Sequence, residues 1–156
     1  MKYYLFQGYL MNCLRDFRIR TNWSYFVGHV AEYCNVAQST AKSWFHDGGQ
    51  PPGRENQIRL MCFLTALGYK VLELEEMGKA RRILTYLIGF SILSVEEAVK
   101  MLGCPSSCEL FHIILDRRSV SQEQLGIIRK TFATRKYDVA DKTADLINRY
   151  SRGLEL

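Results

Sequence analysis

Apolar residues recur at helical spacing along nearly the whole chain, and this periodicity constrains the fold more than any other feature. Residues three or four positions apart share one face of an α-helix. In the first segment the series includes Leu10, Leu14 and Phe17, and this helix is expected to end in the basic stretch 15–20. Alternation of apolar and polar residues, the pattern of a half-buried strand, is scarce. The sequence therefore predicts an all-α fold of about ten helices without a sheet.

Capping and turn residues divide this pattern into separate helices. Ser24 is the expected N-cap of a second helix that ends at Cys34, and Asn35 tolerates the left-handed conformation of a helix end. Gly68 is expected to end a later helix, and Ser94 with Glu97 has the spacing of a capping box. The remaining expected helices span 37–46, 54–67, 79–90, 94–102, 105–115 (with Cys104 as cap and Pro105 in the first turn), 120–132 and 137–150.

Composition is that of a globular protein with a polyanionic partner. Of 156 residues, 47% are hydrophobic and 24% charged, which suits a buried core. No apolar run is long enough to span a bilayer, and the N-terminus lacks a signal-peptide pattern, so a cytoplasmic location without a membrane partner is expected. The five cysteines are expected to be reduced thiols. The net charge of +5 favours nucleic acid as a partner.

The segment 30–44 has the features of a helix-turn-helix. Two short helices can cross closely if the first has a small residue at the contact, a permissive residue forms the turn, and an apolar residue follows it. Ala31, Asn35 and Val36 meet these requirements, while Ala41 and Trp44 give the second helix its inward side. The outward side then carries Gln38, Ser39, Lys42, Ser43 and His46.

The chain resembles the lambda-repressor-like, or xenobiotic-response-element, family of helix-turn-helix proteins over 22–74. The shared order comprises Trp44, the pair Gly48-Gly49, a proline, a further helix, and then the segments 66–69 and 72–74. Asn35 departs from the glycine that the family usually has at the turn, and the first helix is less polar than usual. The resemblance implies a helical bundle that places the helix over 38–46 in the major groove of double-stranded DNA, as a transcriptional regulator.

The outward side chains suit this expectation chemically. The Gln38 amide can pair with adenine, and Lys42 can reach guanine or phosphate. No acidic residue lies on this side of the helix. Supporting contacts to the DNA backbone are expected from Arg20, Asn22, Gln50, Arg54 and Asn56.

The second half of the chain echoes the first, which suggests two tandem units over 1–75 and 76–156. Asn35 and Val36 correspond to Gly103 and Cys104 at a constant offset, and the helix after the motif corresponds to 125–134 after a one-residue slip. Two alternatives follow. The chain forms an internal pseudo-dimer that reads two half-sites, with basic residues at 117, 118, 129, 130, 135 and 136 adding contacts, or the second unit is a dimerisation surface or a layer that covers the apolar first helix.

Other classes of function have weaker signals. Cys104, Cys108 and His112 share a helix face at four-residue spacing, but no fourth metal ligand follows, so neither a metal nor a cofactor is expected. No phosphate-binding loop or activated nucleophile indicates an enzyme. The alternative to a regulator is an interaction or antitoxin-like adaptor module, or an accessory factor of nucleoprotein assembly, in which the motif is mainly structural.

Overall fold

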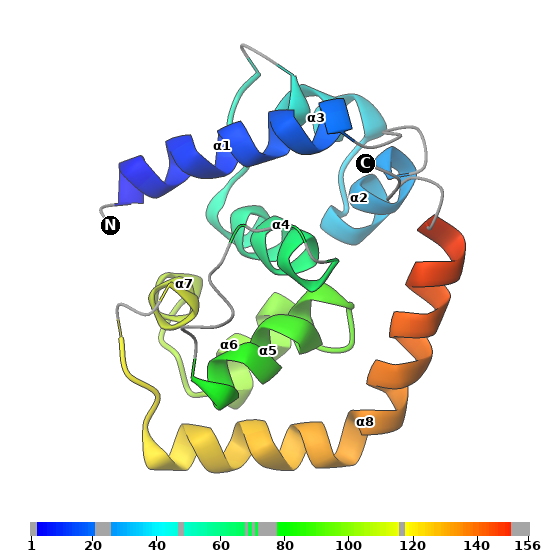
Figure 1. The fold of residues 1–156 in the computed structure, drawn as a ribbon. Helices are drawn as coiled ribbons and strands as arrows, with labels where there is room; N and C mark the ends of the chain where they lie inside the picture. Colours follow the sequence, from blue (N-terminus) through cyan, green and yellow to red (C-terminus); the bar gives the residue numbers. More distant parts are fainter. Residues whose placement is uncertain are drawn as a thin grey trace. The chain divides into compact units, whose positions relative to one another are not determined.

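The computed structural model describes residues 3–20, 26–46, 49–67, 69, 71, 78–115 and 118–150, without the side chains of 3–8, 136–140 and 142–150. These residues form eight helices and no strand, so the all-α class is confirmed, although about ten helices were expected (Figure 1). The helices are α1 (Tyr3–Arg20), α2 (Val27–Cys34), α3 (Gln38–Phe45), α4 (Arg54–Ala66), α5 (Lys79–Gly89), α6 (Val95–Met101), α7 (Ser107–Ile114) and α8 (Gln122–Tyr150). None of the helices in this part of the chain combines the length and the apolar character of a membrane span.

Two compact units make up the chain. The N-terminal unit comprises 1–57 and 144–156, and the central unit comprises 58–143, so one boundary falls inside α4 and the other inside α8. The division of the sequence into 1–75 and 76–156 concerns the repeat and stays a prediction.

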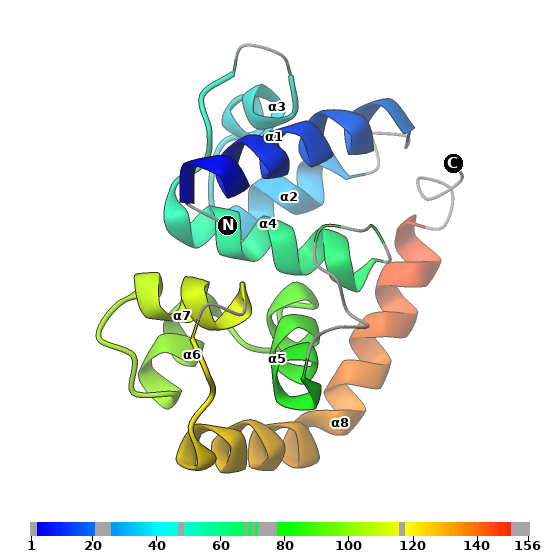
Figure 2. The same ribbon diagram turned by 60° about the vertical axis from the view of Figure 1, so that its left-hand side comes forward.

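Aromatic side chains form the core of the N-terminal unit, in which α1 and α2 both contact α3 (Figures 1 and 2). The ring of Phe17 on α1 lies edge-on to Phe26 with centroids 5.0 Å apart, and 6.3 Å from the ring of Phe45 on α3. All three rings are buried. The Nε of Arg18 donates a hydrogen bond of 3.0 Å to the Phe45 carbonyl, which ties the end of α1 to the end of α3.

In the central unit, α5 and α6 both contact α7. Gly89 allows α5 to approach α4 closely, because a Cβ there would lie 2.8 Å from the Cβ of Ala66 and would overlap the Cys62 carbonyl. The expected capping box is confirmed at the start of α6: the Ser94 Oγ accepts from the Glu97 N–H at 3.0 Å, and the Glu97 carboxylate accepts from the Ser94 N–H at 3.2 Å.

Several expected boundaries need correction. Helix α7 begins at Ser107 with Ser106 as its N-cap, whose Oγ accepts from the Cys108 N–H at 3.3 Å. The N–H of Cys104 is instead bonded to the Val99 carbonyl, so Cys104 closes α6 and does not cap α7. The two helices expected over 120–132 and 137–150 do occur as two helical segments, which α8 joins across a kink with non-helical torsion angles at Arg135. Ser24 and Gly68 lie outside the described residues.

The expected core is largely confirmed at the level of single residues. Val36 is only half-buried, because it lies in the turn after α2. The other residues that the helical pattern predicts to share one core are buried, namely Val30, Ala31, Ala41, Trp44, Ile58, Met61 and Leu64. The first four belong to the N-terminal unit and the last three to the central unit, so only their burial is confirmed.

Candidate nucleic-acid interface

The turn between α2 and α3 has a defined hydrogen-bonding pattern. Asn35 adopts the left-handed conformation, with φ 54° and ψ 51°, as the sequence predicts. Its N–H donates to the Glu32 carbonyl at 3.1 Å, and the Val36 N–H donates to the Ala31 carbonyl at 2.9 Å. These two bonds are those of a Schellman motif, which ends a helix sharply. The chain can therefore begin α3 only three residues after Asn35.

Helix α3 presents one apolar and one polar side. Ala41, Trp44 and Phe45 are buried, which confirms the inward side expected from Ala41 and Trp44. Ser43 is half-buried, and its hydroxyl donates to the Thr40 carbonyl at 2.7 Å. The exposed side chains of this helix and its C-cap are Gln38, Ser39, Thr40, Lys42 and His46.

Thr40 is an exposed residue of this surface that sequence reasoning missed. Gln38, Ser39 and Lys42 were chosen because they lie opposite Ala41 and Trp44 on a helical period. Thr40 lies next to the buried Ala41 in sequence, and its exposure shows that the apolar stripe of α3 is narrow. No acidic residue occurs in α3, so the exposed surface has only Lys42 as a fixed charge.

The segment that links α3 to α4 stays close to the C-terminal end of α3 at Gly49. The Gly49 N–H donates to the His46 carbonyl at 3.3 Å, and a Cβ at position 49 would overlap the Ser43 carbonyl group. Only glycine fits there without a shift of the backbone. Further on, the buried amide of Gln57 donates to the Pro52 carbonyl at 2.8 Å, which joins the link to the first turn of α4.

The expected supporting residues have different surroundings. Gln50 and Arg54 are exposed, with Arg54 the first residue of α4, whereas Asn56 is half-buried. Arg20 is exposed and forms an ion pair of 3.0 Å with Asp16, one turn earlier on α1. Asn22 lies outside the described residues. Of the residues around α3, Arg54 is thus a better candidate than Arg20 for a phosphate contact, because Asp16 competes for Arg20.

The cysteine and histidine side chains of the central unit do not assemble a metal site within the described residues, where no three His, Cys, Asp or Glu groups converge. All five cysteines are free thiols. Burial raises the pKa of the Cys104 thiol, and Glu109 raises it further against the opposing effect of Arg118.

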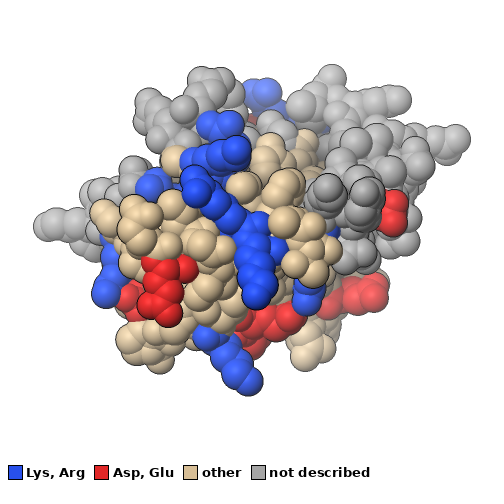
Figure 3. Space-filling model, turned by 90° about the horizontal axis from the view of Figure 1, so that it is seen from below, with Lys and Arg blue, Asp and Glu red and all other residues tan. Residues whose placement is uncertain are grey.

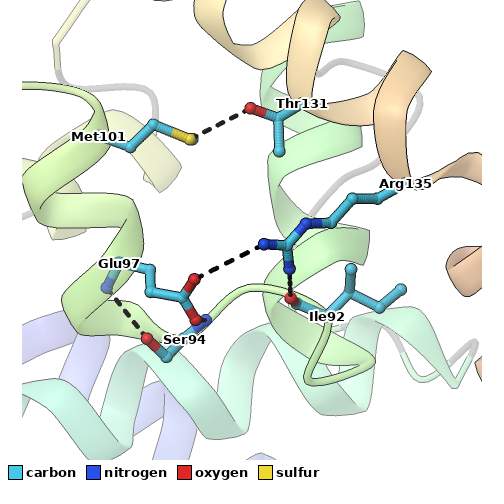
Figure 4. A network of polar contacts seen from close by, with 6 residues as sticks. All are labelled: Ile92, Ser94, Glu97, Met101, Thr131 and Arg135. Atoms are coloured by element: carbon cyan, nitrogen blue, oxygen red, sulfur yellow. Dashed lines mark hydrogen bonds and ion pairs between the residues drawn. The ribbon is translucent and has the colours of Figure 1, made fainter.

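Basic side chains form a second feature of the surface. Figure 3 shows a band of Lys and Arg side chains with acidic side chains on both sides of it. In the central unit, Lys100, Lys130 and Arg135 border a groove of about 470 Å³ between α6 and α8. Arg135 donates to the Ile92 carbonyl at 2.6 Å and lies 3.8 Å from the Glu97 carboxylate, so protein groups already bind it (Figure 4).

Ion pairs therefore neutralise part of the basic charge that was expected to contact DNA from the second half of the chain. Arg118 pairs with Glu109 at 2.6 Å and Arg135 lies near Glu97, whereas Arg129 and Lys130 are exposed and have no ion pair within the described part of the chain. Residues 117 and 136 have no described side chain.

Comparison of the chain with protein-family models, with curated proteins and with solved structures gives no significant match.

Proposed function

We propose that the chain binds double-stranded DNA with α2 and α3 as a helix-turn-helix, and that α3 enters the major groove. The observation that carries this proposal is the two-sided character of α3: Ala41, Trp44 and Phe45 fix one side in the core, and the opposite side is exposed, hydrogen-bonding and free of acidic residues. A major groove accepts a single α-helix, and amide and ammonium side chains of such a helix can hydrogen-bond to the base edges.

Four exposed residues have distinct roles under this proposal. Gln38 and Lys42 contact base edges, and Ser39 contacts a phosphate or a base. Arg54, together with the backbone N–H groups in the first turn of α4, binds the phosphate backbone. The proposal makes the chain a transcriptional regulator of the cytoplasm, with no catalytic step and no cofactor.

The test begins with a selection of bound fragments from random duplex DNA, followed by affinity measurements at several salt concentrations. We expect affinity to fall steeply with salt, because phosphate contacts release counterions. On the selected duplex, Gln38→Ala and Lys42→Ala should each weaken binding by about 1–3 kcal/mol, with less effect on unrelated duplexes.

Two matched variants serve as controls. Gln122 is, like Gln38, the exposed first residue of a helix, and Lys130 is, like Lys42, an exposed lysine of a helix. Gln122→Ala and Lys130→Ala should leave the affinity and the sequence preference for the selected duplex unchanged. Retention of full affinity and preference by the two α3 variants would overturn the assignment of the reading helix. A chain with no salt-dependent binding to any duplex would instead be an interaction or adaptor module, in which the motif is structural.

A further inference from the structure

We infer that the chain reads DNA with one helix only, and that α7, the counterpart of α3 in the central unit, is a packing helix. This inference rests on the proposed function and names its partner more closely: one chain recognises one half-site. It also decides between the two roles that the sequence left open for the second half.

The turn before α7 repeats the turn before α3. Gly103 is left-handed with φ 67°, as Asn35 is with φ 54°. The Gly103 N–H donates to the Lys100 carbonyl at 3.2 Å and the Cys104 N–H to the Val99 carbonyl at 2.9 Å. Both bonds lie 68 residues after those made by Asn35 and Val36, so the same Schellman motif occurs twice. The helix α4 and the straight first part of α8 also begin 68 residues apart, at Arg54 and Gln122.

Helix α7 begins one residue later along the sequence than the offset of 68 between the two turns predicts. It spans 107–114, which is 69 residues after 38–45, because one additional residue separates its turn from its first residue. At this offset the three buried residues of α3 fall on three buried residues of α7, namely Leu110, Ile113 and Ile114. The correspondence shows that the two helices pack through equivalent sides. The slip expected after the motif, which paired 58–67 with 125–134 at an offset of 67, is not seen at the starts of α4 and α8, and the shift at α7 runs in the opposite direction.

The outward sides of the two helices differ. Four of the eight residues of α3 are exposed, namely Gln38, Ser39, Thr40 and Lys42, whereas no residue of α7 is. Lys42 corresponds to Phe111, which is 1% exposed. The charged residue Glu109 of α7 has a side chain that is 11% exposed and pairs with Arg118 at 2.6 Å. A helix with these properties offers no exposed donor and no fixed positive charge to a major groove, since its remaining polar side chains, Ser107, Cys108 and His112, are half-buried.

A single reading helix determines how the chain occupies DNA. Two half-sites one helical turn apart require two reading helices. Because no residue of α7 is exposed, the inference requires the second reading helix of a two-fold symmetric site to belong to a second chain, and it rules out the internal pseudo-dimer as a reading mode. One chain on its own should protect a single half-site.

The test compares equivalent positions by photo-crosslinking of the full chain to the selected duplex. p-Benzoylphenylalanine replaces either Gln38 or Ser107, which correspond at the offset of 69 and are the first residues of α3 and α7. We expect a crosslink to DNA from position 38 and none from position 107. As a second measurement, Lys42→Ala should lower affinity by about 5- to 150-fold, while Arg118→Ala should change it less than about 2-fold.

Every outcome decides the inference. A crosslink from both positions, or a loss of more than about 5-fold for Arg118→Ala, would overturn the single reading helix and leave DNA binding intact. A crosslink from position 107 alone would move the reading site to α7. Absence of any retention on DNA would overturn the proposed function and this inference with it. Native mass spectrometry should find one chain on a duplex with a single half-site, and one chain bound across two half-sites would restore the pseudo-dimer.

Discussion

Gly103 occupies the left-handed turn before α7, where a side chain would strain the backbone. An added Cβ would meet no atom within 4 Å, so the effect of a substitution is conformational only. Because left-handed torsion angles disfavour residues with a Cβ, Gly103→Ala should lower the free energy of unfolding by about 1–2 kcal/mol. Denaturant unfolding measures this change.

Gly126 provides the opposite case in the same experiment. It lies inside α8 with helical torsion angles, is exposed, and has equally free space around its Cβ position. Gly126→Ala should therefore raise the free energy of unfolding by about 1 kcal/mol, because alanine favours the helix. Equal effects of the two substitutions would show that the backbone of Gly103 is not left-handed in solution.

Trp44 anchors the buried side of α3, with 5% of its surface exposed. Trp44→Ala should destabilise the fold by about 3–5 kcal/mol, because it empties a large buried site. Thermal and denaturant unfolding followed by circular dichroism measure the loss. A change below about 1 kcal/mol would place Trp44 at the surface and remove the physical basis of the two-sided α3.

Residue-scale predictions from sequence succeeded where local geometry decides the outcome. The left-handed Asn35, the capping box of Ser94 and Glu97 and the buried Trp44 all follow from short spacings. The bond from Arg18 to the Phe45 carbonyl could not be predicted, because it joins residues 27 positions apart and any arginine of the basic stretch 15–20 was a candidate. Thr40 was missed because the width of an apolar stripe depends on what covers it.

At the scale of elements, the contact of Arg18 with the last carbonyl of α3 fixes the position of the proposed reading helix. This hydrogen bond is partly buried and charge-assisted, so Arg18→Met should lower the free energy of unfolding by about 1–3 kcal/mol while keeping the aliphatic packing. Arg20→Met is the matched control, because Arg20 pairs with Asp16 at the surface and should change stability by less than about 1 kcal/mol. Equal losses would mean that α1 does not hold α3 through Arg18.

The same helices show where element prediction fails. The start of α7 was assigned to Cys104 and Pro105 from residue preference alone, but the Cys104 N–H is already used to close α6. Aligning the two halves at one constant offset also placed Glu109 against Ala41, and the additional residue before α7 shifts this pairing to Leu110. The segment 110–115, which is apolar except for His112, indicates a buried helix, and the alignment at a constant offset did not take this signal into account.

At the scale of the whole molecule, the segment 60–64 of α4 is fully buried. Leu60, Met61, Cys62, Phe63 and Leu64 are consecutive and each has 0% of its surface exposed, so this segment is covered all round, whereas Arg54 at the start of the helix is exposed. A sequence with apolar residues on every side of a helix predicts burial but not which elements provide the cover. This is the physical limit on predicting the assembly of an all-α chain from periodicity alone.

Thiol labelling can test whether this segment of α4 is buried in solution. Burial raises the pKa of the Cys62 thiol, and the thiolate is the reactive form, so Cys62 should react with iodoacetamide only when the molecule opens. Cys108 is half-buried, whereas the other four cysteines are buried. Mass spectrometry of quenched samples should therefore find Cys108 alkylated first and Cys62 among the last, with both rates rising with pH as more thiolate forms.

The control is Cys108→Ser, which should remove the fast reaction and leave the slow ones unchanged. Increasing urea should accelerate the labelling of Cys62 in proportion to the unfolded fraction, because a thiol inside the fully buried segment 60–64 becomes accessible only when the core separates. If Cys62 instead reacts as fast as Cys108 in the absence of urea, α4 is exposed in solution. The buried helix would then have to be sought elsewhere in the chain.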